Sequence, residues 1–315
     1  MWNNNLENET LDEILELIIE TYDVGFTKNF GVINSYLKPA RVSKDIINQH
    51  KDSNNIVRDV INSLPNDDST KRIVKSLLYR LLYIHFGDGE THYITRSGKE
   101  ILDELVQLIS RLEIHPVYLD EIVHLGPLNL NEFNTCVNNA THLVQYVKDR
   151  DNLHERDVYE RFNNILMGEI AEALVIKWLH QNNKYAESAV DKTSEQPDLG
   201  HDIYLKDLQG NTIKCSVKSS LAAFRSPKEI LLESKLASTE KEIREVNIQV
   251  YFWYNLYPKD GHRITLPNTN NVALFSWAGN NDIERFKSYK TEQREAPEIP
   301  LCELRKMRDL LELIQ

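Results

Sequence analysis

Four side chains in the middle of the chain have the types that metal-assisted hydrolysis requires. Glu172 lies in a segment with helical apolar spacing, Asp202 opens a predicted strand, and Ser216 and Lys218 lie in the strand after it. Apolar and polar residues alternate in that second strand, so the pleat places Ser216 and Lys218 on one face. Gly210 permits a hairpin turn between the strands. We therefore expect an aspartate, a lysine and a helix glutamate to meet at one end of a hairpin.

These residue types suit the cleavage of a phosphodiester bond. That reaction needs an in-line water, neutralisation of charge on the phosphate oxygens and help for the leaving oxygen. Mg²⁺ takes hard oxygen ligands, usually one or two carboxylates together with water and substrate phosphate. A lysine beside the carboxylates stays protonated and can contact both water and phosphate. Two carboxylates and a lysine on rigid elements are the minimum set for this chemistry.

Three motifs stand in order along the chain: Gly168-x-x-x-Glu172, then Pro197-Asp198 with Asp202 after it, then Ser216-Val-Lys218. Together they resemble the PD-(D/E)xK nuclease superfamily, whose members include restriction endonucleases. The resemblance covers about residues 165 to 280. It implies a mixed-sheet core with helices on both faces. It also implies that Asp202 and a second acid bind Mg²⁺, and that Lys218 positions or activates the attacking water.

Ser216 departs from the family pattern, because it stands where the family has Asp or Glu. A hydroxyl is a much poorer Mg²⁺ ligand than a carboxylate, so a second acid has to come from elsewhere in the chain. We predict Glu172 for this role, with Asp202 and Glu172 as the metal ligands. Apolar residues share its helical stripe and would turn it towards the sheet: Val175, Ile176 and Leu179.

Several alternatives stay open for the acids. Glu169, Glu229 or Glu233 could supply the second carboxylate in place of Glu172, and Glu169 and Glu172 could instead be solvent-facing acids. Asp198 competes with Asp202 for the metal. Asp202 is preferred because it begins the apolar alternation, whereas Asp198 could cap the turn. His201 is expected to be a surface loop residue.

The N-terminal third has the spacing of a small helical domain. Apolar periodicity predicts helices over residues 10–24, 43–50, 54–64, 71–86 and 101–112, with a short strand at 92–95. The order of helices, hairpin and closing helix, with the motif Tyr93-Ile-Thr-Arg-Ser-Gly98, resembles the winged-helix family of DNA-binding domains. The resemblance implies that the helix starting near Ser69 is a recognition helix.

Basic residues gather at the start of that predicted recognition helix. Between residues 71 and 80 there are four bases and no acid. By the resemblance, Lys71, Arg72 and Lys75, together with Thr70, would contact the major groove or phosphates. The alternative is that these residues form the solvated face of an ordinary amphipathic helix.

The domain organisation follows from these segments. We expect a winged-helix-like DNA-binding domain over 1–115, a helical connector over 116–160 and a nuclease domain over 161–315. Strands are predicted over 246–254 and 271–277, and helices over 227–241 and from about 300 to the C-terminus. The expected fold class is α/β, α+β over the whole chain, with a mixed sheet.

Composition narrows the class of protein. The chain has 315 residues, a formal charge of −11 and three widely spaced cysteines. The charge gives no support to nonspecific DNA binding, so DNA contacts must come from local basic surfaces. The cysteines fit neither a disulfide scaffold nor a zinc site. The first twenty residues are acidic, unlike a signal peptide, and the apolar runs are interrupted by charges. A cytoplasmic protein is expected.

The sequence as a whole predicts a Mg²⁺-dependent, site-specific endonuclease of double-stranded DNA, similar to a type II restriction enzyme. By analogy it would be a homodimer with a partner DNA methyltransferase. A repair or junction-resolving nuclease is possible within the same class. From another class, a DNA-binding regulator with an inactive nuclease fold is the alternative. Motifs for nucleotide, zinc-protease and esterase chemistry are missing from the sequence.

Overall fold

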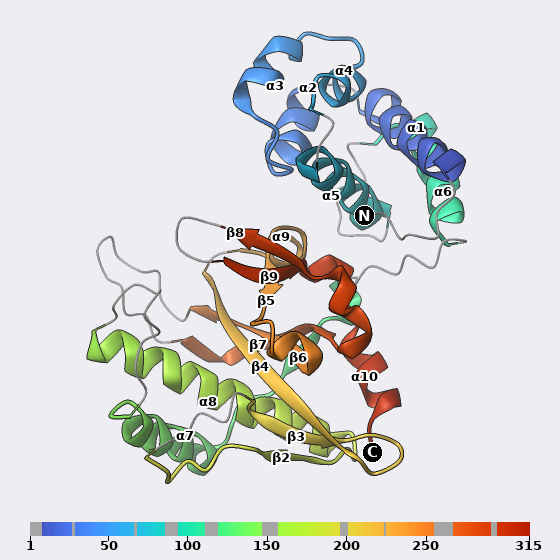
Figure 1. Cartoon of the computed structure of the whole chain (residues 1–315). Helices are drawn as coiled ribbons and strands as arrows, with labels where there is room; N and C mark the ends of the chain where they lie inside the picture. Colours follow the sequence, from blue (N-terminus) through green and yellow to red (C-terminus); the bar gives the residue numbers. More distant parts are fainter. Residues whose placement is uncertain are drawn as a thin grey trace. The chain divides into compact units, whose positions relative to one another are not determined.

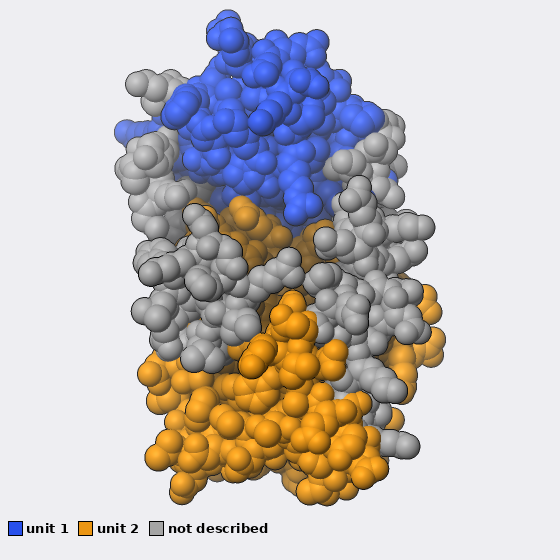
Figure 2. Space-filling view, turned by 90° about the vertical axis from the view of Figure 1, so that its left-hand side faces the viewer, with its two compact units in different colours: residues 1–118 blue, residues 119–315 orange. Residues whose placement is uncertain are grey.

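The computed structural model describes residues 8–26, 29–65, 68–85, 94–110, 119–146, 157–195, 201–223, 225–254, 267–290 and 295–315. The chain divides into two compact units, residues 1–118 and 119–315 (Figure 2). The sequence places boundaries after 115 and after 160. The described residues of the expected connector lie within the second unit instead, because they contribute a strand and a helix to it.

The described part of the first unit is helical. Its elements are α1 (Asn8–Gly25), α2 (Asn29–Val32), the π-helical turn η1 (Ile33–Leu37), α3 (Lys44–His50), α4 (Ile56–Asn62), α5 (Asp68–His85) and α6 (Arg96–Ser110). The predicted helices therefore form, and Ser43 caps α3 as expected by accepting from Ile46 N at 3.3 Å. Residues 86–93, which hold most of the predicted hairpin, lie outside the described residues. Phe26 and Ile94 form an isolated antiparallel bridge.

The core of the first unit comes from helical stripes. Ile14, Ile18 and Tyr22 recur every four residues on α1 and are buried, as are Leu77 and Leu81 on α5. The hydroxyl of Tyr22 donates to the carbonyl of Leu77 at 2.7 Å, so its buried polar atom is satisfied. These contacts tie α1 to α5 through apolar burial and one long-range hydrogen bond.

The second unit is a mixed α/β structure. Its elements are η3 (Leu119–Glu121), β1 (Val123–Leu125), α7 (Leu130–Leu143), α8 (Val158–Gln181), β2 (Ala186–Ser188), β3 (Ile203–Lys206), β4 (Thr212–Ala223), α9 (Pro227–Glu233), β5 (Lys235–Ala237), η4 (Glu242–Arg244), β6 (Val246–Tyr254), β7 (Pro267–Ala278), η5 (Asn280–Arg285), β8 (Lys287–Lys290), β9 (Glu295–Pro300), η6 (Leu301–Glu303) and α10 (Met307–Leu313). Among the described helices of both units, none is long and apolar enough to cross a membrane.

A six-stranded sheet with the order β1-β7-β6-β4-β3-β2 forms the centre of this unit, and a three-stranded sheet has the order β5-β9-β8. β4 and β6 are parallel, whereas the other neighbours in the large sheet are antiparallel. Helix α8 packs along the sheet with α7 beside it (Figure 1). The chain crosses from β4 to β6 through α9, β5 and η4, as a parallel pair requires.

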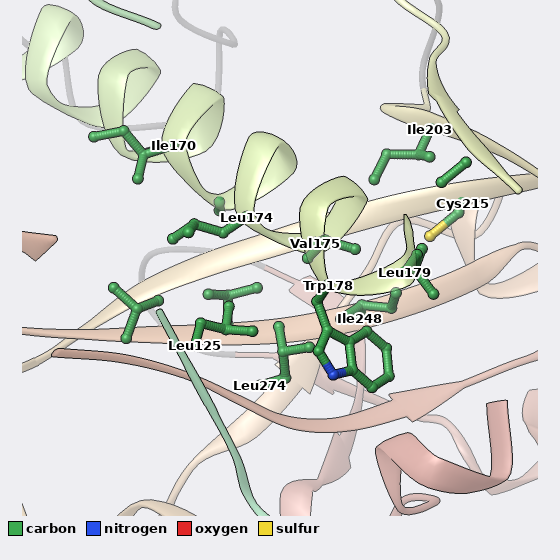
Figure 3. Packing of buried hydrophobic residues seen from close by; sticks show 14 of the residues in the cluster. Leu125, Ile170, Leu174, Val175, Trp178, Leu179, Ile203, Cys215, Ile248 and Leu274 are labelled. Atoms are coloured by element: carbon green, nitrogen blue, oxygen red, sulfur yellow. The ribbon is translucent and has the colours of Figure 1, made fainter. Parts of the chain in front are cut away.

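One large apolar cluster joins α8 to the sheet. Ile170, Leu174, Val175 and Leu179 of α8 are buried in a cluster with residues from all six strands of the large sheet (Figure 3). α10 adds Met307 to the same cluster. Burial of this apolar surface stabilises the unit by roughly 25 cal/mol per Å² removed from water. The other face of the sheet is covered near α9, where Trp253 Nε1 donates to the carbonyl of Arg225 and Arg225 lies over the ring of Tyr251.

Three segments differ from the sequence-based expectation. The helix predicted over 227–241 ends at Glu233, because the backbone of Ser234 is extended. The strand β5 follows, and Leu236 is its one fully buried residue. The helix predicted from about 300 begins at Met307, after β9 and η6. The predicted connector contains β1, which pairs with β7 in the large sheet.

Helices α1 and α6 approach each other at two glycines, which yields a stability prediction. A Cβ on Gly98 would overlap the backbone of Gly25, whereas a Cβ on Gly31 in α2 would meet nothing within 4 Å. Gly98→Ala should therefore destabilise the first unit by about 2 kcal/mol through overpacking. Gly31→Ala, the matched control, should stabilise it slightly because alanine favours the helix.

Urea denaturation followed by circular dichroism and by tryptophan fluorescence measures this effect. Three of the four tryptophans, Trp178, Trp253 and Trp277, lie in the second unit, so most of the fluorescence change should stay in place while the helical signal shifts. Equal stability of the Gly98→Ala and Gly31→Ala proteins would contradict the close helix contact.

Candidate active site

The hairpin of β3 and β4 sets Asp202 against Ser216. Ile203 pairs with Cys215, and continuing the antiparallel register by one residue brings Asp202 opposite Ser216. The N–H of Asp202 donates to the carbonyl of Cys215 at 2.9 Å, and the N–H of Val217 donates to Asp202 Oδ2 at 2.6 Å. Both the main chain and the carboxylate of Asp202 are thus fixed to β4.

Side chains of β4 alternate between two faces of the sheet. Cys215 is buried with Ile203 on the face against α8 (Figure 3). Ser216 and Lys218 therefore lie on the opposite face, and they share it as the sequence predicts. Ser216 is 1% exposed, and its hydroxyl has no hydrogen-bond partner in the described part of the chain. Position 216, where the PD-(D/E)xK pattern has an acid, thus holds a buried hydroxyl without a hydrogen-bond partner among the described residues.

Lys218 forms an ion pair with Glu242, a residue that the sequence reasoning did not select. Lys218 Nζ lies 2.7 Å from Glu242 Oε1, and the two side chains are 26% and 11% exposed. The other oxygen of Glu242 accepts from the N–H of Thr239 at 2.8 Å, which is half of a helix-start motif. The pattern Thr239-x-x-Glu242 could have indicated that turn, but nothing in the sequence indicated its contact with β4.

Asn247 of β6 holds η4 in place beside Lys218. Its Nδ2 donates to the carbonyls of Glu242 and Glu245 at 2.7 and 3.0 Å, and its Oδ1 accepts from Ser238 Oγ at 2.8 Å. Asn247 is fully buried and pairs in register with Ser216. The side-chain amide of Asn247 therefore positions Glu242 beside Lys218 by binding the main chain of this turn.

The charges on this face influence one another. Burial raises the pKa of Asp202, and this effect exceeds the lowering by the Val217 N–H and by the cations Lys218 and Lys192, while Glu242 raises it further. Burial also opposes ionisation of Glu242, but Lys218 and the Thr239 contacts outweigh it, so the pKa of Glu242 is lowered. Asp202 is thus influenced by the charges of Lys218, Lys192 and Glu242.

Glu172 belongs to a different ion-pair cluster. Lys192 Nζ lies 2.7 Å from Glu172 Oε2 and 2.7 Å from Glu169 Oε1, and Asn139 Nδ2 donates to Glu169 Oε2 at 2.9 Å. Both acids are buried, so the alternative of solvent-facing acids is wrong. Glu172 is 7% exposed on α8. Its carboxylate, however, is bound by Lys192 of the β2–β3 segment, which the sequence reasoning also missed because that segment has no periodic pattern.

One lysine shared by two buried acids leaves a net negative charge in this cluster. Burial raises the pKa of Glu172 even though Lys192 lowers it. For Lys192 burial acts in the lowering direction, but Glu172 and Glu169 outweigh it and raise its pKa, so the lysine stays protonated. The cluster is stable as long as Lys192 is present to compensate the acids.

The remaining candidates have defined environments or lie outside the described part. Asp198 is outside the described residues, so its competition with Asp202 stays open. Glu229 accepts from Ser226 at the start of α9, and Glu233 is exposed. His201 is buried rather than on the surface, because its ring packs against Tyr204 with centroids 5.0 Å apart.

The polar face continues beyond Lys218 across the sheet. Gln249 pairs in register with Lys218 on one side and with Ser276 on the other. Gln249 Nε2 donates to Ser220 Oγ at 3.2 Å, whereas the buried Ser276 hydroxyl has no partner in the described residues. A stripe of buried polar groups therefore crosses three strands on the face away from α8. Such a stripe is unusual for a sheet centre, where apolar residues dominate.

The predicted DNA-contacting residues lie at the start of α5. Lys71 and Arg72 are exposed, and Lys75 is half-buried. Arg80, the fourth base of this segment, is buried, and its Nη1 donates to the carbonyl of Ser35 at 3.3 Å. The basic surface is therefore smaller than the sequence alone indicates.

A divalent ion at this site would have few ligands from the protein. Within the described ranges, no three His, Cys, Asp or Glu side chains form a group that could hold a metal. Mg²⁺ commonly uses one or two carboxylates, with water and phosphate completing its shell. Asp202 Oδ1 accepts no hydrogen bond from the described residues and is available for such a ligand role.

Comparisons with family models, with curated proteins and with solved structures give no match to this chain.

The Glu169–Lys192–Glu172 cluster yields a second stability prediction. Lys192→Met should destabilise the second unit by about 3–5 kcal/mol at pH 7, because two buried carboxylates lose their cation. The loss should shrink as pH falls, since protonation removes the charge that is left unpaired. Urea denaturation followed by tryptophan fluorescence at several pH values measures this change.

Two further variants control this experiment. Lys177→Met breaks the half-exposed pair with Glu132 and should cost less than about 1 kcal/mol. Adding Glu169→Gln and Glu172→Gln to Lys192→Met should recover most of the stability, because no buried charge remains. A small, pH-independent effect of Lys192→Met would contradict a compensated buried cluster.

Proposed function

We propose that the chain is a Mg²⁺-dependent endonuclease that hydrolyses phosphodiester bonds in double-stranded DNA. In this proposal the second unit is a nuclease domain with a restriction-endonuclease-like core. The observation that carries the proposal is the arrangement of Asp202 and Lys218. Asp202 lies opposite Ser216 across the hairpin, and Lys218 follows Ser216 by two residues on the same face of β4. The Ser216 hydroxyl is buried and has no hydrogen-bond partner among the described residues.

The order of elements supports this assignment. Helix α8 precedes the antiparallel strands β2, β3 and β4, and α9 leads to β6, which is parallel to β4. This mixed sheet, with α8 on one face and α9 near the other, agrees with the core that the motif resemblance implies. Asp202, directly before β3, and the Ser216-Val-Lys218 motif of β4 are then neighbours in the sheet, as a shared active site requires.

The proposed roles follow from the charges and positions of the side chains. Lys218 would bind a phosphate oxygen and orient the attacking water, since its ammonium is partly exposed beside two acids. Asp202 would hold the cation through the oxygen that Val217 leaves unbonded. Bound Mg²⁺ would neutralise charge on the phosphate and lower the pKa of the water. Glu172 was proposed from sequence as the second ligand, and it would have to leave Lys192 to take that role.

The first unit is proposed as the DNA-reading part, of winged-helix type. Helix α5 would be the recognition helix, with Lys71, Arg72 and Lys75 contacting phosphates or base edges. Cutting both strands of a symmetric site would call for a homodimer, and a restriction enzyme would act together with a DNA methyltransferase. A repair or junction-resolving nuclease would use the same catalytic side chains.

A second candidate is a DNA-binding regulator with an inactive nuclease fold. The observation that favours it is the closed contact between Lys218 and Glu242, combined with serine at position 216. A lysine held by an acid is less available to a phosphate. The two candidates differ in whether DNA is cut, not in whether it is bound.

Cleavage of supercoiled plasmid tests the proposal. With Mg²⁺ the protein should produce discrete fragments, and EDTA should stop the reaction. Asp202→Asn and Lys218→Met should each reduce the rate at least about 100-fold, since each removes a charge that acts on the transition state.

Asp207→Asn controls for general damage to the hairpin. Asp207 lies at the β3–β4 turn and binds backbone N–H groups there, so its variant should cut normally. Circular dichroism should be unchanged in all three variants. Binding of the plasmid without any nicking would favour the regulator instead.

DNA affinity tests the role of α5. Lys71→Ala with Arg72→Ala should weaken binding about tenfold and lower the slope of log K against log salt by about one for each lost phosphate contact. Lys44→Ala with Lys51→Ala removes the same charge from α3 and the residue after it, and should change little. Fluorescence anisotropy across a salt series measures both; equal slopes for the two double variants would make α5 structural.

A further inference from the structure

We propose that Glu242, together with Asp202, forms the divalent-cation site of this protein, and that Glu242 supplies the carboxylate that Ser216 cannot. This inference rests on the proposed function, because it names the second ligand of the same site. It replaces Glu172 in that role with a residue from a different element, the turn η4 before β6.

The first argument is that Glu242 lies close to Lys218. Glu242 Oε1 lies 2.7 Å from Lys218 Nζ. Asn247, which binds the carbonyl of Glu242, pairs in register with Ser216, and Ser216 lies opposite Asp202. Glu172 instead contacts Lys192 at 2.7 Å and lies on α8, which covers the opposite face of the sheet. Among these candidates, Glu242 is thus the acid that shares a face with both Asp202 and Lys218.

The charge balance of the group is the second argument. Two carboxylates and one ammonium leave a net charge of about −1 when all are ionised, as a cation site requires. Lys218 contacts Glu242 at 2.7 Å. In the Glu169–Lys192–Glu172 cluster the lysine contacts both acids at once, so each acid already has a cation as its partner.

The buried hydroxyl of Ser216 is the third and independent argument. It is nine-tenths or more buried, faces the same side as Lys218, and has no hydrogen-bond partner among the described residues. A buried hydroxyl without a partner costs free energy unless a water or an ion satisfies it. A hydrated cation between Asp202 and Glu242 would supply a water for this oxygen.

The anchoring of Glu242 makes it a rigid ligand. Asn247 binds the carbonyl of Glu242, and the N–H of Thr239 binds its carboxylate. The carboxylate therefore needs little ordering when the cation binds, which favours affinity. One oxygen must exchange Lys218 for the metal, and the released ammonium is then available to a phosphate.

Calorimetric titration of the full chain with Mn²⁺ or Mg²⁺, without DNA, tests the site directly. Glu242→Gln and Asp202→Asn should each weaken binding at least tenfold, and the double variant should bind more weakly than either single variant, because no carboxylate of the site then remains. Glutamine keeps the volume and can still accept from Thr239, so the fold should persist.

Glu132→Gln is the matched control. Glu132 also caps the start of a helix and also pairs with a lysine, at 2.8 Å from Lys177 Nζ, so its variant should bind the cation as the unchanged protein does. Glu172→Gln separates the rival assignment. If Glu172→Gln lowers affinity and Glu242→Gln does not, the inference is overturned in favour of α8.

The outcomes also separate this inference from the proposed function. Metal binding that depends on Glu242, without DNA cleavage, would support the site and remove the nuclease proposal. Cleavage together with unchanged metal affinity in Glu242→Gln would retain the nuclease and remove Glu242. Faster cleavage by Glu242→Gln, with unchanged metal affinity, would show that Glu242 blocks Lys218 and would also overturn the inference.

Discussion

The packing of α8 against the central sheet is the constraint on which the candidate site depends. Apolar side chains of α8 bury Ile203, Cys215 and Ile248 on one face. Since alternate residues of a strand point to opposite faces, this burial fixes which polar residues can meet. A register slip of one residue would bury Lys218 in the apolar cluster. The geometry of the polar face is therefore a consequence of hydrophobic packing on the other side.

Two lysine–carboxylate clusters in this unit differ in their electrostatic design. Lys192 lies between two buried glutamates, so its ammonium group is paired within the protein. Lys218 contacts one acid, Glu242, while Asp202 is held by a backbone N–H. The first arrangement resembles a structural bridge between α8 and the β2–β3 segment. The second leaves Asp202 Oδ1 and the Ser216 hydroxyl without a hydrogen-bond partner among the described residues.

The parts of the fold that local signals encode could be predicted from the sequence. The β3–β4 hairpin follows from alternation and from Gly210, whose φ of 86° needs glycine, and β6 follows from a dense β-branched run. The limits of α9 were missed because Leu236 is a single buried residue in a three-residue strand. A helical stripe and a short strand cannot be distinguished there by periodicity.

The candidate site was predicted in part for the same reason. Asp202, Ser216 and Lys218 lie on one hairpin, so strand alternation was enough to place them together. Glu242 is 24 residues from Lys218 along the chain, and its contact is set by how η4 folds back onto β6. That geometry is tertiary and leaves no periodic trace. The sequence shows serine at position 216, but it could not indicate that Glu242 would contact Lys218.

Asn247 has a consequence for how this protein can vary during evolution. Its amide binds the main chain of η4 and not the side chains of Ile243 or Arg244. Relatives could therefore exchange those two residues freely while keeping the asparagine at the start of β6. Substitution of Asn247 would instead be tolerated only with a compensating change in the turn, so covariation should link this core amide to the segment whose main chain and Ser238 hydroxyl it binds.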